Sequence, residues 1–412
     1  MKVGDIIKHY RIQQKMTQHE LSSAICSITY LSKLENNKLV PSEEILALIC
    51  SRLQLSLEKL YQAEDIKLKE ELFQFYKYTQ LKHTEEAAKL YDKLSAIFNE
   101  AHQSISMELY FDLFSSYYQF ATDPSPDIWE QIERLNGKEK MMNHEQKYLH
   151  LKLKGTFYYH QQDLCLTIRY LTEAVEYAKE LDINEGDIFY KISLTYSRLN
   201  RLTRSNSYAE KAIHIFQQDL DFEKVIDCYM VMGINYNLLG EYHFCEEYLH
   251  KIEAISPKFS TPVLQVSLYH NFGYCFYNQE KFELALSYLD KCLQVPNVSE
   301  KETLNSLYLM SKIYLKKEQK ETASTFITKG FKIANHNQDQ SYIYKFRVLI
   351  HELEEDESSD ELETLLSLEV IPYFKKYGDR DDYDYYVKLL ADTYYNNHKY
   401  KLASNYYRLV IY

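Results

Sequence analysis

Apolar residues recur every three or four positions along the first sixty residues, which predicts four or five short helices. One apolar face runs from Ile6 to Ile12, and another from Tyr30 to Leu34. Thr17 and Glu20 fit a capping box that opens the segment TQHELSSAI. Ser42 fits the N-cap of SEEILALICSRL, whose first turn is acidic. The start of the chain is therefore predicted to be a small helical domain.

Two of these helices are short and joined by a tight turn, and the second carries a polar edge, as in a helix-turn-helix. The stretches TQHEL, YLSKLENN and PSEEIL resemble the phage-repressor type of this motif over most of the first sixty residues. The turn at residues 24–27 reads AICS and lacks the usual glycine. This turn resembles that of the peptide-responsive regulators of the bacilli.

The motif gives each of its residues an expected role. Residues on the outer side of the recognition helix are expected to reach base edges in a major groove: Ile28, Thr29, Ser32 and Lys33. Residues near the helix ends are expected to hold phosphates: Gln18, Asn36, Asn37 and Lys38. Arg11 and Glu35 match positions that pair between the first and third helices of such repressors, which favours a structural ion pair over a DNA contact. The alternative for the base readers is a solvated helix edge.

A second pattern, with a period of about 40 residues, runs to the C-terminus. A small residue is followed three positions later by an aromatic residue. A second small residue comes nine positions after the aromatic residue, and another small or apolar residue comes seven positions after that. The best copy comprises Gly273, Phe276, Ala285 and Cys292, and other copies begin at Gly155, Ser193, Gly233, Ser311 and Ala391. A degenerate unit is expected within 341–376. The pattern resembles the tetratricopeptide repeat, which has two antiparallel helices per unit.

We therefore predict an all-α fold with two domains. Residues 1–62 form the helix-turn-helix DNA-binding domain, and residues 66–412 form a right-handed superhelix of degenerate tetratricopeptide repeats with about nine helix pairs. This second domain is expected to bind peptide and to dimerise. The small residues should let the two helices of a unit approach closely, and the aromatic residue should fill the gap toward the neighbouring unit. A period longer than the usual ~34 residues predicts long helices and strong curvature.

Residues on the inner face of the first helix of each unit need not pack. The positions projected there are Arg198, Asn237, His270, Asn271, Tyr274, Asn278, Asn305, Tyr308 and Lys312. Asn is a poor residue for a helix interior, yet its carboxamide can pair with both the C=O and the N–H of an extended peptide. This set is the candidate peptide site; the alternatives are solvated Asn side chains and a general protein-binding scaffold.

Charge and composition refine this interpretation. The net charge is −12, but residues 1–60 hold eight Lys or Arg and six Asp or Glu, so this segment is about +2. A module with so few phosphate contacts binds loosely, so a dimer that reads two half-sites is expected. Seven scattered Cys without a CxxC indicate buried thiols in a reducing cytoplasm. The chain has no signal peptide and no apolar run of membrane-spanning length.

Motifs for enzymatic chemistry are missing from the sequence: there is no Walker loop, GxGxxG, GxSxG, HExxH or EF-hand loop. The 14 His show no ligand spacing, so neither a metal nor a cofactor is expected. The acidic run HELEEDESSDELE (351–363) could bind cations, but its irregular spacing favours a solvated loop and helix start. DRDDYDYY (379–386) is expected to be a cap and the outer face of the last unit.

The helix-turn-helix and the degenerate repeats together resemble the Rap–Rgg–NprR–PlcR–PrgX family of bacterial peptide-pheromone receptors, especially its NprR- and PlcR-type transcription regulators. LYHNFGYCFYNQEKFELAL also resembles the Rap motif whose Asn clamps the peptide backbone, here Asn271. The resemblance implies a cytoplasmic quorum-sensing regulator, homodimeric or larger, whose operator DNA binding is controlled by a short, secreted and re-imported peptide. The alternatives are a scaffold that inhibits a phosphorelay response regulator to restrain sporulation, and a phosphatase of the Rap kind.

Overall fold

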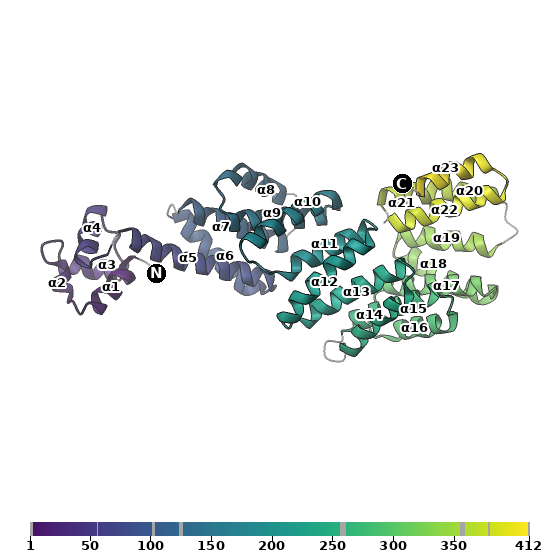
Figure 1. The fold of residues 1–412 in the computed structure, drawn as a ribbon, viewed down its shortest axis with the longest axis horizontal. Coiled ribbons are helices and arrows are strands. Elements are labelled where there is room, and N and C mark those ends of the chain that lie inside the picture. The colour runs from purple at the N-terminus through teal and green to yellow at the C-terminus, as the bar shows by residue number, and fades with distance from the viewer. Residues whose placement is uncertain are drawn as a thin grey trace. The chain divides into compact units, whose positions relative to one another are not determined.

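A computed structural model describes residues 3–55, 57–100, 104–122, 127–255, 261–354, 359–377 and 380–410. Every regular element within these ranges is helical, which confirms the all-α prediction (Figure 1). The chain divides into two compact units, Met1–Ile183 and Asn184–Tyr412, which we call unit 1 and unit 2. The division lies in the connection between two helices of the repeat region.

Unit 1 begins with the helix-turn-helix domain. Its helices are α1 (Val3–Gln13), α2 (Gln18–Ser22), α3 (Ile28–Glu35) and α4 (Glu43–Arg52). They enclose a small apolar core whose fully buried members include Ile7, Leu21, Leu31, Leu34 and Ile49. Both predicted caps are present, since Thr17 and Glu20 form a reciprocal capping box on α2 and Ser42 caps α4. Each helix start is thus fixed by its own sequence.

The rest of unit 1 is built of helix pairs. These are α5 (Leu57–Gln80) with α6 (Thr84–Glu100), α7 (Ile105–Thr122) with α8 (Asp127–Gly137), and α9 (His144–His160) with α10 (Leu164–Glu180); a short 3₁₀ turn, η1 (Glu139–Met141), precedes α9. Helix α5 runs unbroken through residues 62–66, where we place the domain boundary. The helix-turn-helix domain is therefore joined to the repeats by continuous helix, and the boundary itself stays a prediction.

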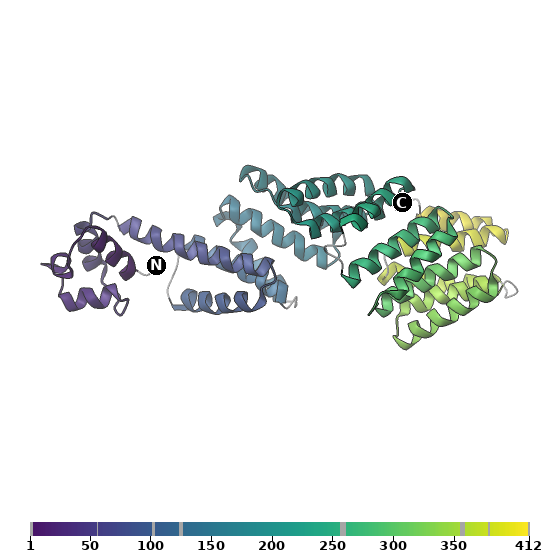
Figure 2. The ribbon, with the colours of Figure 1, turned by 90° about the horizontal axis from the view of Figure 1, so that it is seen from below.

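Unit 2 continues the array of paired helices, which lie side by side in both views (Figures 1 and 2). The pairs are α11 (Gly186–Arg198) with α12 (Leu202–Gln218), α13 (Phe222–Leu238) with α14 (Tyr242–Ile255), α15 (Pro262–Asn278) with α16 (Phe282–Gln294), α17 (Glu300–Lys316) with α18 (Lys320–His336), and α22 (Arg380–Asn396) with α23 (Tyr400–Val410). Helix α19 (Gln340–Leu353) precedes the last of these pairs. Six of these helices are 17 residues long, consistent with the long repeat period.

The degenerate unit expected within 341–376 is α19 followed by an interrupted second helix. That helix comprises α20 (Ser359–Leu365), a π-helical turn η3 (Leu366–Val370) and α21 (Ile371–Tyr377). Pro372 lies just after the π turn. Proline has no N–H to donate and its ring clashes with the carbonyl four residues earlier, so a local widening of the helix accommodates it. This proline explains why the repeat pattern is hard to see here.

The small residues of the repeat pattern hold the two helices of each unit close together. A Cβ on Gly155 would lie 2.4 Å from Cδ2 of Leu171, and one on Gly273 would lie 2.9 Å from Cδ2 of Leu289. Where the pattern has serines instead, Ser205 Oγ donates to the carbonyl of Ser193 at 2.8 Å. All of these side chains or backbones are buried. The predicted close approach of the helices within a unit is confirmed.

The aromatic residue of the pattern has a different neighbour from the one we predicted. It stacks or tilts against a ring twelve residues later, on the second helix of its own unit. Six such pairs have ring centroids 5.2 to 5.6 Å apart: Tyr158–Tyr170, Tyr196–Tyr208, Tyr236–Tyr248, Phe276–Tyr288, Tyr314–Phe326 and Tyr394–Tyr406. Twelve residues cover the end of one helix, a tight turn and the start of the next, antiparallel helix, so the two rings meet within a unit. The pairs account for ten of the 40 tyrosines and stabilise each unit internally.

Candidate DNA- and peptide-binding sites

Helix α3, the predicted recognition helix, presents a polar edge. Ser27 caps the helix, its Oγ accepting the N–H of Tyr30. Leu31 and Leu34 are fully buried in the domain core, and this fixes which side of α3 faces outward. On that outer side Ile28, Thr29 and Lys33 are exposed and Ser32 is half-buried. The four predicted base readers therefore lie along one side of the helix, and Ile28 is an exposed apolar residue among them.

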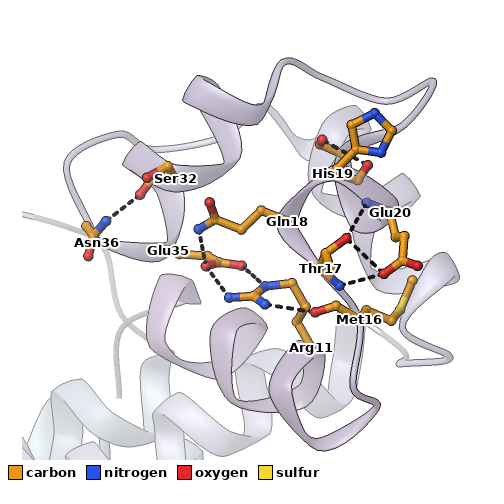
Figure 3. A network of polar contacts seen from close by, with 10 residues as sticks. Arg11, Met16, Thr17, Gln18, His19, Glu20, Ser32, Glu35 and Asn36 are labelled. Carbon is orange, nitrogen blue, oxygen red and sulfur yellow. Dashed lines mark hydrogen bonds and ion pairs between the residues drawn. The ribbon is translucent and has the colours of Figure 1, made fainter.

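Behind that edge, Arg11 and Glu35 form the ion pair expected from the motif (Figure 3). Arg11 Nε lies 2.6 Å from Glu35 Oε1, and Arg11 Nη2 donates to Oε2 at 2.9 Å. Burial of Glu35, which is 1% exposed, would by itself raise the pKa of its carboxyl. The hydrogen bonds from Arg11 and Gln18, together with the charge of Arg11, nevertheless lower that pKa below its usual value. The pair is a complete internal contact that ties α1 to α3.

The predicted phosphate-binding residues are divided between this network and the end of α3. Gln18 donates to Glu35 Oε2 at 2.8 Å, so its amide supports the ion pair (Figure 3). The side-chain amide of Asn36 donates to the carbonyl of Ser32 at 2.7 Å. Asn37 has a φ of 55°, which Asn tolerates well, and its Oδ1 accepts the N–H of Gly4 at 3.1 Å. Lys38 is exposed, so of these four residues it has the side chain best placed for a phosphate.

All nine predicted peptide-binding residues lie in unit 2, on α11, α13, α15 and α17. Arg198 is exposed at the end of α11. Asn237 on α13 is buried, and its Oδ1 accepts a hydrogen bond from the side chain of Asn278 on α15 at 3.1 Å. Tyr274, one turn before Asn278, is half-buried, and burial raises the pKa of its hydroxyl. The Asn pair therefore connects the first helices of two consecutive repeats.

Asn271 and His270 lie next to each other in the middle of α15. The amide of Asn271 donates to the carbonyl of Ser267 at 2.8 Å and approaches the sulfur of Met230 at 3.4 Å. Within the described part of the chain its Oδ1 receives no hydrogen bond. His270 Nδ1 is buried without a hydrogen-bond partner there, and burial lowers the pKa of this imidazole to about 4. Asn271 thus keeps an acceptor for a ligand N–H.

The predicted residues on α17 contact the two following units, at α19 and α22. Asn305 Oδ1 accepts the hydroxyl of Tyr342 on α19, and the hydroxyls of Tyr308 and Tyr386 are 3.4 Å apart. The ammonium of Lys312 lies 4.4 Å from the ring centroid of Tyr385 on α22. Residues of α17 and α22, about 75 positions apart in sequence, are therefore in contact. This contact indicates that the array of repeats is strongly curved here.

The interpretation of residues 379–386 as a cap and an outer face was wrong for Asp382, Tyr385 and Tyr386. Tyr386 is fully buried, Tyr385 lies over Lys312, and Asp382 forms an ion pair with Lys345 of α19 at 2.7 Å. The acidic residues suggested a solvated surface, but one of them neutralises a lysine of the preceding repeat. Asp379 lies outside the described residues.

A buried polar network in the same unit was not predicted. Asn235 on α13 is fully buried, accepts from Ser197 Oγ at 2.6 Å, and donates to Ser205 Oγ at 2.8 Å and to Asn206 Oδ1 at 2.7 Å. It joins α11, α12 and α13. An Asn in the middle of a helix, two positions before Asn237, was the available signal.

No group of three or more His, Cys, Asp or Glu within the described ranges is arranged to hold a metal ion. Of the acidic run 351–363, residues 355–358 lie outside those ranges. The part of the run that is described ends α19 and begins α20. In the same described part of the chain, no helix is both long and apolar enough to cross a membrane.

Comparison with known proteins agrees with this architecture. A helix-turn-helix family matches residues 7–60, and a tetratricopeptide repeat family matches residues 266–297. The transcriptional activator NprA of Geobacillus stearothermophilus is 28% identical over 401 residues, which span 94% of this chain and 97% of NprA. Over nearly its whole length the sequence is thus similar to a regulator of the kind found in the Rap–Rgg–NprR–PlcR–PrgX family. NprA is a transcriptional activator, which agrees with the helix-turn-helix match at the start of this chain.

Solved structures and a further relative are similar to this chain at lower identity. The apo form of the quorum sensor NprR from B. thuringiensis has a TM-score of 0.70 at 22% identity, covering 84% of this chain and 98% of NprR. NprR in complex with its cognate peptide NprX gives a TM-score of 0.64 over 84% of this chain and 97% of that one. Response regulator aspartate phosphatase I of Bacillus subtilis is 22% identical over 69% of this chain and 72% of its own length. The phosphatase is thus a more distant relative than the activator.

Proposed function

We propose that this chain controls transcription by binding operator DNA through α3, and that a short extended peptide bound along the inner faces of α13, α15 and α17 regulates this binding. The exposed edge of α3 is the observation that carries the DNA-binding half of the proposal. Thr29 and Lys33 on that edge can donate to base edges, while the Arg11–Glu35 pair keeps α3 in place behind them.

Asn271 supports the peptide half of the proposal. Its Oδ1 is open to a peptide N–H, and the hydrogen bond that its amide makes to Ser267 orients the side chain. The Asn237–Asn278 pair, one repeat boundary away, offers donors and acceptors that an extended backbone can exchange into. NprR has been solved with its cognate peptide NprX, and we propose a ligand of the same class here. Contacts to the peptide backbone would bind it, and neighbouring side chains would select among sequences.

We also propose that the active form is a homodimer or a larger homo-oligomer. Lys33 and Lys38 are the exposed cations at the recognition helix and the turn after it, so one module makes few phosphate contacts. Because affinity for DNA at cellular salt depends strongly on the number of such contacts, two modules on two half-sites are needed. The repeat domain would hold the two copies together.

Peptide binding would act through the curvature of the repeats. Each repeat packs mainly on its neighbours, so a peptide spanning α13 to α17 biases a collective bend. A nearly complete reversal of the population requires the peptide to prefer one curvature by roughly 5 kcal/mol. In this scheme the chain acts in the cytoplasm on a secreted and re-imported peptide, and it works by binding and without catalysis.

The test is an electrophoretic mobility shift with promoter DNA, with and without synthetic peptides encoded by the short open reading frame just downstream. A peptide-dependent change in the DNA shift supports the proposal. Asn271→Ala should abolish the response to peptide without altering the fold. Unchanged peptide affinity of this variant in calorimetry would contradict the assignment of Asn271.

A matched variant separates the two halves of the proposal. Thr29→Ala combined with Lys33→Ala should remove sequence-specific DNA binding, because both side chains lie on the exposed edge of α3. The oligomeric state and the peptide affinity should stay unchanged. If the operator footprint persists in this double variant, α3 is not the DNA-reading element.

The second candidate function is that of a scaffold that binds and inhibits a response regulator to restrain sporulation. It is favoured by the match to response regulator aspartate phosphatase I over 69% of this chain. Co-purification with a response regulator, lost on addition of peptide, would support it. Loss of phosphate from a labelled response regulator would be required before a phosphatase activity is assigned.

A further inference from the structure

Lys312 on α17 is surrounded by aromatic rings from three helices. Its ammonium lies 4.4 Å from the ring centroid of Tyr385, 5.5 Å from that of Tyr308 and 5.7 Å from that of Tyr277. These rings belong to α22, α17 and α15. Together with Glu352 of α19, whose charge acts on Lys312, they form what we call the Lys312 cluster. All of its members lie in unit 2.

The ammonium of Lys312 has no acceptor of its own. Within the described ranges it makes no hydrogen bond, and no carboxylate lies within ion-pair distance. Lys345, one repeat further on, contrasts with it because it contacts Asp382 at 2.7 Å. Aromatic faces attract a cation but accept none of its three N–H donors in the way an oxygen does. Lys312 is therefore an incompletely satisfied donor.

Glu352 is in the same condition. In the described part of the chain its carboxylate has neither a hydrogen bond nor an ion pair, and burial raises its pKa above the usual value. Lys312 and Glu352 affect each other's pKa, yet they lie beyond ion-pair distance. Each of these two opposite charges therefore lacks a direct partner within the described part of the chain.

The cluster is accessible even though little water surrounds it. Tyr385 is 37% exposed and Lys312 is half-buried, so a ligand can reach both. Burial nevertheless raises the pKa of the Tyr385 hydroxyl well above its usual range and that of Tyr277 to about 12. Tyr385 therefore combines a partly exposed ring with a hydroxyl that protein atoms surround. Electrostatic contacts are stronger at such a place than on an open surface.

The charges around Lys312 leave an excess of one positive charge. Those that act on it are Lys316, Lys345, Glu352 and Asp382. Lys345 and Asp382 neutralise each other, so Lys312 and Lys316 face the single carboxylate of Glu352. A single negative charge balances this excess. Because the cluster lies on inner faces of the repeat helices, next to Tyr308 of the candidate peptide site, the anion is expected to belong to the peptide.

We propose that Lys312 binds a carboxylate of the regulatory peptide, so that the cluster selects peptides carrying an acidic group at this end of the binding site. The inference rests on the proposed peptide-binding function. Glu352 repels a second acidic group and accepts an N–H donor, which orients the peptide. The carboxylate has two sources, an Asp or Glu side chain or the free C-terminus of the peptide.

The probe is a library of short synthetic peptides of one fixed length, built from Ala, Leu, Lys, Asn and Asp at every position. One half is made with free C-terminal carboxylates and the other half with C-terminal amides. Peptides retained by the immobilised full-length protein are identified by mass spectrometry. Asp enriched over Asn at one position assigns the carboxylate to a side chain, and acids enriched over amides assign it to the C-terminus.

The expected enrichment is about ten-fold or more, the ratio that one hydrogen bond between charged groups supplies. Lys312→Gln should abolish it, and Lys312→Arg should restore much of it. Lys317→Gln is the matched control, since Lys317 pairs with Glu283 away from the cluster and its loss should leave the enrichment unchanged. Thermal unfolding of each variant verifies that it is folded.

The outcomes distinguish a failure of the Lys312 inference from a failure of the proposed peptide-binding function. If peptides are retained without a preference for acids, or if Lys312→Gln keeps that preference, the Lys312 inference is overturned while the peptide-binding function stands. If no peptide of any composition is retained above a blank surface, the proposed peptide-binding function falls and the inference falls with it.

Discussion

Glu35 in the helix-turn-helix domain and Lys312 in unit 2 are both charges withdrawn from water, but their surroundings differ. Glu35 receives hydrogen bonds from Arg11 and Gln18, and its opposite charge is in direct contact. Lys312 has aromatic rings around it and a carboxylate, Glu352, that acts on it from beyond ion-pair distance. Within the described residues the first site is complete and the second is open.

The difference separates a charge that holds a fold together from one that is kept for a ligand. A buried charge costs free energy unless its partners are present, so an internal pair is retained where the pair itself defines the structure. A charge without partners lowers stability until a ligand supplies them. A buried charge therefore stabilises the fold at Glu35 and is available to a ligand at Lys312. Measuring how each substitution changes the free energy of unfolding can distinguish these two roles.

The largest expected effect is at the complete site. Arg11→Ala leaves Glu35 buried without its cation and should lower the free energy of unfolding of the helix-turn-helix domain by about 3–5 kcal/mol. Amide hydrogen exchange of α1–α4 in the full chain measures this locally. The double variant Arg11→Met with Glu35→Leu removes both charges and should cost much less. A cost below about 1 kcal/mol for Arg11→Ala would show that the pair is not structural.

An intermediate effect on stability is expected at His150 of α9, where only one of the two ring nitrogens has a hydrogen-bond partner among the described residues. Its Nε2 lies 2.9 Å from Asn136 Oδ1, but its Nδ1 is buried without a hydrogen-bond partner in the described residues. Burial, and to a smaller extent the charge of Lys154, lowers the pKa of His150 to about 4. Protonation would place an N–H on Nδ1 with nothing to accept it, so the folded state holds the imidazole neutral.

The sign of the pH dependence follows. An unfolded chain protonates His150 near its ordinary pKa of about 6.5, whereas the folded chain does so only near 4. Stability is therefore lost as the pH falls from about 6.5 toward 4, by on the order of 3 kcal/mol. Urea unfolding between pH 4 and 7 should show this loss in the native protein and a flatter profile in His150→Gln. Identical profiles would contradict it.

The smallest expected effect has the opposite sign and lies at the open site. Lys312→Met removes a charge without an acceptor and should stabilise unit 2 at pH 7 by about 1 kcal/mol. Burial lowers the pKa of Lys312 to about 8, below its ordinary value, so its penalty is present below pH 8 and is relieved as the pH rises toward 10.5. The advantage of the variant should therefore disappear at high pH, as measured by urea unfolding.

Lys345→Met is the control for that measurement, because Lys345 also lies over the ring of Tyr308 but has a direct partner in Asp382. Its removal leaves Asp382 without a cation and should destabilise unit 2. If both lysine variants destabilise the protein equally, Lys312 is a structural residue and the contrast with Glu35 disappears.

Local motifs and periodicity predicted most of the fold. Thr17 and Glu20 were identified because a cap and its partner are three residues apart, and the repeat anchors because small residues recur every 38 to 40 positions. The Arg11–Glu35 contact followed from the motif. These features depend on short separations or on a template, so the sequence contains them directly.

The candidate sites were predictable only in part. Lys312 and Asn271 could be projected onto the inner face of a helix, but the partners of Lys312 could not. Glu352 and Tyr385 are 40 and 73 residues away, and whether they meet Lys312 depends on small rotations added over several repeats. The charge-rich stretch around Asp382 was taken for a surface because its neutralising partner, Lys345, is in another repeat.

The unbroken course of α5 determines what kind of signal the DNA-binding module can receive. A flexible tether would let that module sample many orientations whatever the repeats do. A continuous helix transmits rotation and tilt. A small rotation of the repeats at one end of α5 would therefore change the orientation of the exposed edge of α3 at the other end. Placing two glycines in that helix should therefore uncouple operator binding from peptide while leaving each activity intact by itself.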